Sequence, residues 1–234
     1  MNLKELNHRN PLRILDRSVQ GGLGGGNLGI VAARAGVGKS GFVTCVALDD
    51  LLRGRKVLHV SRKHGVGHVR DFYDEIFGDL ARSARLEETV VARRRLDENR
   101  FIHATQGHAI EYQRLADLIE ILRANASFVP DTIIVDGHDF ATEGSTLAER
   151  LRDLARETGS ELWMTLRTTR ADVSEDWHEL PTPVAALGDL PSVVVYLQPA
   201  GNSVHIRLLR DHDRSEVEDP GLELDPQTFL IREA

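Results

Sequence analysis

The chain has 234 residues, which is long enough for one sizeable α/β domain with a hydrophobic core. No stretch approaches the ~20 apolar residues that a membrane-spanning helix needs, and the first residues lack the apolar run of a signal peptide. The formal net charge of -7 favours solubility and opposes general binding to nucleic acid. The single cysteine, Cys45, cannot form an internal disulfide, so we expect a cytoplasmic protein. The lack of a long apolar run predicts no association with a membrane.

The N-terminal part of the chain leads from a polar segment into a buried strand. Residues 1–20 form this lead-in, and the glycine-rich stretch 21–26 is predicted to be a loop. The apolar run 28–32 does not alternate with polar residues, which predicts a strand buried on both faces. A helix is predicted over 39–52, with Gly54 as its stop signal.

Strands and helices continue to alternate through the middle of the chain. Short apolar runs predict strands at 57–60, 101–104, 132–135 and 162–166. Apolar residues at helical spacing occupy the segments between them, around 69–77, 112–122 and 147–154. Thr146-x-x-Glu149 resembles a capping box that opens the last of these helices. The highly charged stretch 79–100 is predicted to be an exposed helical insertion.

The C-terminal part of the chain has a different pattern. Apolar segments at 193–196, 204–208 and 229–231 have no helices between them and predict closing strands, partly antiparallel, at a sheet edge. Strand–helix alternation over the rest implies a mostly parallel sheet with helices on both faces, joined by right-handed crossovers. We therefore predict an α/β fold in one domain spanning 1–234.

The most specific motif is a phosphate-binding loop that reads Ala-Arg-Ala-Gly-Val-Gly-Lys-Ser over 33–40. It fits the P-loop pattern when alanine is accepted at the first glycine position. The two glycines allow successive N–H groups to turn toward an anion, and the following helix adds its positive N-terminal end. The predicted nucleotide-binding residues are Arg34, Ala35, Gly36, Val37, Gly38, Lys39, Ser40 and Gly41.

A magnesium site is predicted beside this loop. Lys39 would reach the outer phosphates, and the Ser40 hydroxyl would bind the metal. Asp136 follows the buried run Ile133-Ile134-Val135 and supplies the carboxylate expected at the end of a neighbouring strand, as in a Walker B motif. The expected ligands are ATP, or ADP, and Mg²⁺. Asp139 is a second acid in the same loop.

These motifs together resemble the RecA-like P-loop ATPases, most closely the DnaB helicase C-terminal domain and the KaiC-like proteins. The resemblance implies a RecA-type sheet, ATP with magnesium, and a ring in which neighbouring subunits complete each other's sites. It covers nearly the whole chain, although only the phosphate loop is individually specific. The resembling segments are 11–16, 21–26, 33–40, 56–61, 133–136, 162–170, 193–197 and 209–212.

Three departures from the family pattern concern hydrolysis. Family members usually carry a glutamate just after the second strand, whereas this chain has Lys63 and His64 there. The family's pair of trans-acting basic residues appears as Arg210 and His212, and histidine is a poor substitute for a guanidinium. The polar sensor at the end of the 162–166 strand is not obvious; the candidates are Thr165, Arg167 and Thr168. Nucleotide binding is therefore predicted more firmly than hydrolysis.

The loops that would line a DNA channel in a RecA-like motor are acidic here. Residues 137–144 contain two acids and neither lysine nor arginine. The later loop starts with Arg167 and Arg170, continues with four acids, and holds Trp177, which we expect to pack or to contact a protein. Acidic loops repel phosphates, so binding to nucleic acid is not expected. Arg170 is a further candidate for stacking on the nucleotide base.

Three functions remain open at this stage. The first is a nucleotide-dependent regulatory or switch protein, with slow or absent hydrolysis and a protein partner that senses the γ-phosphate. The second is an active, homo-oligomeric RecA- or DnaB-like ATPase, with a link to DNA left open, in which His64, Asp139 or a neighbouring subunit replaces the missing glutamate. The third is a small-molecule P-loop kinase, disfavoured because no arginine-rich lid is evident. The pair His64 and His68 and the run 93–95 are expected to be solvated and ion-paired surface residues, respectively.

Overall fold

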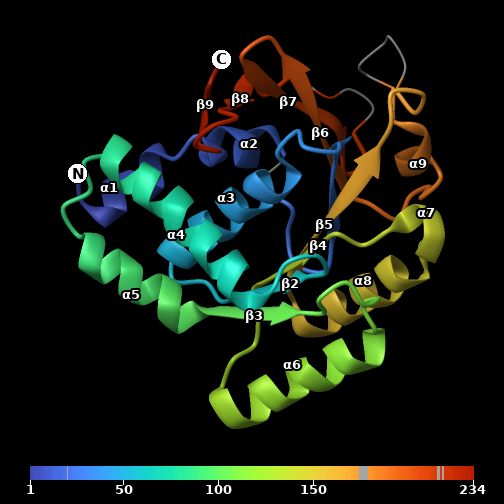
Figure 1. Ribbon diagram of the computed structural model, residues 1–234, viewed down its shortest axis with the longest axis horizontal. Coiled ribbons are helices and arrows are strands. Elements are labelled where there is room, and N and C mark those ends of the chain that lie inside the picture. The colour runs from blue at the N-terminus through green and yellow to red at the C-terminus, as the bar shows by residue number, and fades with distance from the viewer. Residues whose placement is uncertain (20, 174–178, 215–216, 218) are drawn as a thin grey trace.

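The computed structural model describes residues 1–19, 21–173, 179–214, 217 and 219–234. Over these residues the chain forms one mixed sheet in the order β3-β2-β4-β5-β1-β6-β7-β8-β9 (Figure 1). The six strands from β3 to β6 pair in parallel, and β7, β8 and β9 extend the sheet as antiparallel strands. The strands are β1 (Leu28–Arg34), β2 (Val57–Ser61), β3 (Arg100–Ala104), β4 (Thr132–Asp136), β5 (Glu161–Thr168), β6 (Val193–Ala200), β7 (Ser203–Asp211), β8 (Leu222–Leu224) and β9 (Ile231–Glu233).

Helices cover both faces of this sheet, as the strand–helix alternation predicts. One hydrophobic core joins α1 to α5 to the sheet residues that include Val31, and the other joins α6 and α8 to the opposite face, which includes Ile30. The α/β class and the mostly parallel sheet are therefore confirmed. The helices are α1 (Leu3–Arg9), α2 (Leu12–Ser18), α3 (Lys39–Leu52), α4 (Val66–Ser83), α5 (Thr89–Asn99), α6 (Tyr112–Ala126), α7 (Phe140–Glu143), α8 (Thr146–Thr158) and α9 (Thr182–Ala185). Among the described residues, no helix is long and apolar enough to cross a membrane.

Several local expectations differ from the structure. The stretch 79–100 is not one exposed helix: α4 ends at Ser83, and α5 buries Ala92 and Leu96 completely in the first core. The lead-in folds as α1 and α2, whose leucines belong to the same core. In the predicted capping box, Ser145 rather than Thr146 takes the N-cap position. The strand β8 was not expected.

Helix α3 is the central helix of the first core, and its C-terminal end holds two buried carboxylates. Asp49 is ion-paired with Arg13 of α2 and lies 3.5 Å from Arg53. Asp50 is 3.0 Å from Arg55 and accepts a hydrogen bond of 2.6 Å from the Thr132 hydroxyl. These contacts fix the C-terminal end of α3 to the lead-in and to β4. They therefore help to hold the N-terminal end of α3 in place, next to the C-terminal end of β1.

The Asp50 carboxyl predicts a pH-dependent stability. Burial raises its pKa to about 7, against the opposing effects of Arg55 and the Thr132 hydroxyl. Because the folded pKa lies above the unfolded value of 3.8, the folded state binds the proton more tightly, and stability falls as pH rises toward 7. The free energy of unfolding of the wild type should therefore fall between pH 6 and pH 8. We expect this fall to be smaller by about 1 kcal/mol in Asp50→Asn. Urea unfolding at the two pH values measures this, with the exposed Asp71→Asn as the matched control; an unchanged slope in Asp50→Asn would contradict it.

Candidate nucleotide-binding site

The predicted phosphate loop connects the C-terminal end of β1 to the start of α3. Gly36 and Gly38 have φ values of 78° and 118°, a left-handed conformation that side chains other than glycine rarely adopt. Ala33 lies within β1 and does not have this conformation, so its methyl group meets no conformational obstacle. Phe42 N–H bonds back to Gly38 O at 2.9 Å. The amides of the first turn before it have no partner within the helix, and a helix N-terminus of this kind is suited to binding an anion.

Lys39 lies against this loop. Its Nζ donates hydrogen bonds of 3.0 Å to the carbonyl oxygens of Ala33 and Arg34. Burial lowers the pKa of Lys39 to about 8; Asp136 opposes this shift, and the positive charges of Lys63 and Arg167 add to it. The charges of Lys63 and Arg167, from two other strand ends, therefore repel Lys39, and a bound polyanion would relieve this repulsion.

A cavity of about 580 Å³ joins these groups. It is lined by the phosphate loop, by the segments that follow β2 and β4, and by the end of β5. Within the described part of the chain, the side chains of Lys63 and Arg167 have neither an ion-pair partner nor a hydrogen bond, although both residues line this cavity. Unpaired cations around a glycine-rich helix N-terminus are suited to phosphate groups.

Asp136 lies where expected at the end of β4, but β4 is not the immediate neighbour of β1. Strand β5 lies between them, and it contributes Thr165, whose hydroxyl donates a 2.8 Å hydrogen bond to Asp136 and accepts one of 3.0 Å from Gly137 N–H. Of the three sensor candidates, Thr165 is therefore the one that contacts the carboxylate. Arg167 lines the cavity, and Thr168 is buried.

The residues present fit a magnesium ion that is held partly by a nucleotide. Ser40 and Asp136 both line the cavity, and no cluster of three or more histidine, cysteine or acidic side chains is found among the described residues. Magnesium is commonly bound by one or two carboxylates, substrate phosphates and water, without a full set of protein ligands. The Ser40 hydroxyl and the Asp136 carboxylate are the groups that would hold it here. His64 and His68 stack at 4.3 Å and do not belong to such a cluster.

The segment after β2 carries no carboxylate into the cavity. Arg62 pairs with Glu143 of α7 at 2.8 Å, while Lys63 and His64 line the cavity. Asp139 lines it as well, and a hydrogen bond from the Thr142 side chain holds the pKa of Asp139 below its usual range. Asp139 is thus an ionised carboxylate in the cavity that also holds the glycine-rich loop. It follows β4, whereas the glutamate of the resembling family follows the second strand.

Other predicted residues lie outside the cavity. Arg210 donates hydrogen bonds to the carbonyl oxygens of Gly188 and Pro191, and His212 lies between Asp211 and the carbonyl of Leu23. The basic run 93–95 is engaged with Asp74, Glu98 and the carbonyl of Leu52, which confirms its expected surface role. Cys45 is buried, as expected for a core residue. Trp177 lies outside the described residues.

Two aromatic residues of the cavity were not anticipated. Phe72 of α4 and Phe229, which follows β8, form an apolar end next to Gly41. Phe72 belongs to the predicted apolar stripe of its helix, whereas no sequence signal links Phe229 to a loop near the other end of the chain.

A comparison with models of known protein families finds no match, and neither does a comparison with curated proteins. The function is therefore interpreted from the geometry of the site.

Proposed function

We propose that this chain is a RecA-like nucleotide-binding protein that binds ATP and magnesium at residues 34–41 and Asp136. The observation that carries the proposal is the cavity itself, which is lined by a glycine-rich helix N-terminus, by Lys39, by two cations whose side chains have no partner among the described residues, and by the carboxylate of Asp136. A central phosphate-loop strand in a mostly parallel sheet, with antiparallel strands at one edge, supports the RecA-like assignment. In this interpretation Lys39, Lys63 and Arg167 bind phosphates, and Ser40 and Asp136 hold the metal.

The proposed output is a switch. The segment 61–65 leads from β2 into α4 and places Lys63 and His64 in the cavity, where a γ-phosphate would attract the lysine. It is fixed by a hydrogen bond from His64 N–H to the Ser61 hydroxyl at 3.2 Å. Without a carboxylate in this segment, hydrolysis is slow, and the ATP-bound state persists long enough to present α4 and its flanking residues to a protein partner. A homo-oligomer is part of the proposal as well.

An active ATPase is the second candidate, because Asp139 lines the same cavity as an ionised carboxylate. The test is to measure Mg-ATP binding by calorimetry and phosphate release in the same preparation. Tight binding with turnover far below the ordinary ~10 s⁻¹ of enzymes is expected for the switch. Turnover near that value would favour the ATPase, and absence of ATP binding would reject both.

Single-stranded DNA is expected to bind weakly and to leave phosphate release unchanged. The described part of the 137–144 loop contains Asp139 and Glu143. The ion pair between Glu143 and Arg62 has no net charge, so Arg62 does not make this loop positively charged. Fluorescence anisotropy with a labelled oligonucleotide, at two salt concentrations, measures the affinity. Submicromolar binding with a steep dependence on salt would contradict this prediction, because such a slope reports many phosphate contacts.

A further inference from the structure

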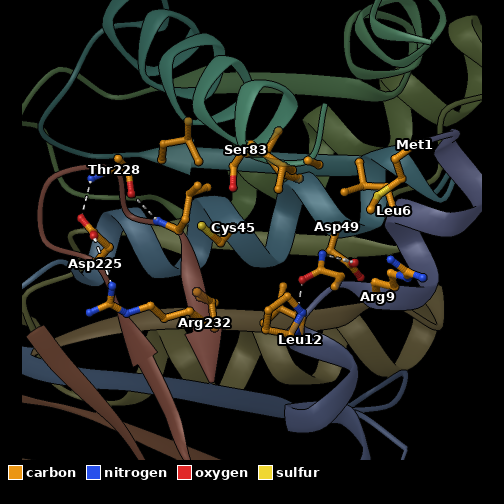
Figure 2. Close-up of a pocket in the computed structure, with 18 residues that line it drawn as sticks. Met1, Leu6, Arg9, Leu12, Cys45, Asp49, Ser83, Asp225, Thr228 and Arg232 are labelled. Atoms are coloured by element: carbon orange, nitrogen blue, oxygen red, sulfur yellow. Dashed lines mark hydrogen bonds and ion pairs between the residues drawn. The ribbon is translucent and has the colours of Figure 1, made fainter. Parts of the chain in front are cut away.

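The turn that carries Phe229 is tightly fixed. It joins β8 to β9, and Figure 2 shows its residues Asp225 and Thr228 lining the same pocket as Cys45 of α3. The Asp225 carboxylate accepts hydrogen bonds from the N–H groups of Gln227 and Thr228 at 2.8 and 3.0 Å. Phe229 N–H bonds to Asp225 O at 2.8 Å, and Phe229 has a φ of 57°. A bulky residue in the left-handed region is uncommon and costs free energy, so the surrounding contacts must impose it.

The Phe229 side chain lies directly on the first turn of α3. A Cβ atom at Gly41 would clash with Cδ1 of the Phe229 ring, so only glycine leaves room for this contact. The Phe229 carbonyl accepts a 2.9 Å hydrogen bond from the Cys45 thiol, whose pKa burial raises to about 12. The ring also packs edge-on against Phe72 of α4, with 5.3 Å between the ring centroids. The strained turn therefore positions the Phe229 ring against the phosphate loop.

The lining of the cavity consequently combines two kinds of side chain. Lys39, Lys63 and Arg167 are cationic, while Phe72 and Phe229 are apolar and aromatic. Gly41 directly follows the serine of the phosphate loop, and the Phe229 ring lies on it. A nucleoside triphosphate has a matching division between a polyanionic tail and a flat aromatic base. The Phe72 and Phe229 rings offer a base nothing with which to hydrogen-bond.

We infer that Phe229, supported by Phe72, is the stacking surface for the base of the bound nucleotide. The inference rests on the proposed nucleotide binding and adds a specificity to it. Because the surface acts by stacking and not by hydrogen bonding, it accepts both adenine and guanine. The smaller pyrimidine bases bind less tightly, since they offer less area to the ring. Stacking on an aromatic side chain tolerates different bases because every base has a π-face.

The experiment compares Mg-ATP with Mg-tripolyphosphate, which has the anionic tail and no base. Calorimetry on the wild type and on Phe229→Ala should show ATP binding weakened by between about fivefold and about a hundredfold, since stacking on an aromatic side chain is worth ≈ 1–3 kcal/mol. Tripolyphosphate binding should be equal in the two proteins. Phe229→Tyr keeps the stacking ring and should retain ATP affinity. Phe128→Ala, which removes a buried ring outside the cavity, is the matched control and should change neither ligand.

The outcomes separate the two hypotheses. If tripolyphosphate and ATP both fail to bind the wild type, the proposed function is wrong. If both bind but Phe229→Ala lowers the two affinities equally, or lowers neither, the phosphate site stands and the stacking surface is rejected. A GTP affinity more than about tenfold from that of ATP would also reject it, because that difference requires hydrogen-bond readout. Should Phe229→Ala not fold, Phe229→Leu takes its place, because leucine keeps an apolar side chain and removes the aromatic ring. The ratio of ATP affinity to tripolyphosphate affinity is then compared between Phe229→Leu and the wild type.

Discussion

Replacing Lys39 by alanine is expected to weaken Mg-ATP binding by at least ~1.5 kcal/mol, which is about tenfold or more. The Lys39 ammonium lies over the phosphate loop, bonded to two of its carbonyl oxygens, and lines the cavity with Ser40 and Asp136. A charge-assisted contact to phosphate is lost in the variant, while the backbone amides of the loop remain. Calorimetry with saturating magnesium measures the change. Lys4→Ala, at an exposed position of α1 outside the cavity, is the matched control.

The pH dependence of the same interaction gives a second measurement. Because burial lowers the pKa of Lys39 to about 8, the free protein loses this charge as pH rises through that value. A phosphate next to the ammonium favours its protonated form, so ATP affinity should fall between pH 7 and pH 9 in the wild type and change less in Lys39→Ala. Equal ATP affinity for the wild type and Lys39→Ala at pH 7 would reject the phosphate-loop assignment.

The elements that local patterns define were predictable from the sequence. Helix α3 spans the expected residues 39–52, since its start is set by the glycines of the loop and its continuation by apolar residues that face the core on nearly all sides. Strand β4 was visible because it is buried on both faces and reads as an uninterrupted apolar run. The glycine-rich turn between β1 and α3 was predictable because its pattern lies within a few residues, and Gly36 and Gly38 do have positive φ.

Features that depend on distant contacts were not predictable. Strand β8 has three residues and exists because it pairs with β7 and β9, which no local pattern reports. The left-handed backbone conformation of Phe229 is imposed by its turn and by the contact of its ring with Gly41. The position of Phe229 in the cavity therefore follows only from the folded chain. The hydrogen bond between Thr165 and Asp136 likewise depends on β5 lying between β1 and β4, whereas the sequence suggested a directly neighbouring strand.

The largest expected effect concerns the missing glutamate, and it is a gain of activity. Lys63 and His64 occupy the segment after β2 and line the cavity. If ATP binds there as we propose, a carboxylate at either position lies in the same cavity as the γ-phosphate and the attacking water. General-base assistance is typically worth roughly 10²–10⁴-fold. We therefore expect His64→Glu or Lys63→Glu to raise ATP hydrolysis by about a hundredfold or more in at least one variant. Phosphate release under saturating Mg-ATP measures it.

The two substitutions are not equivalent, and the structure distinguishes them. Lys63 is one of the cations that act on Lys39, so Lys63→Glu removes positive charge from the phosphate site and should also weaken ATP binding. His64→Glu leaves Lys39, Lys63 and Arg167 in place and should alter affinity less. His68→Glu is the matched control, because His68 stacks on His64 from the first turn of α4 and does not line the cavity. It should leave hydrolysis unchanged.

A neighbouring subunit that completes the site would make the rate depend on protein concentration, so each variant is measured across a range of concentrations. Fast hydrolysis by the wild type would show that another residue already assists the water. Asp139 is then the first position to replace, because its carboxylate is ionised and lines the same cavity. Loss of that activity in Asp139→Asn would replace the switch with an active ATPase. A slow wild type in which neither glutamate accelerates hydrolysis would show that the 61–65 segment does not approach the γ-phosphate.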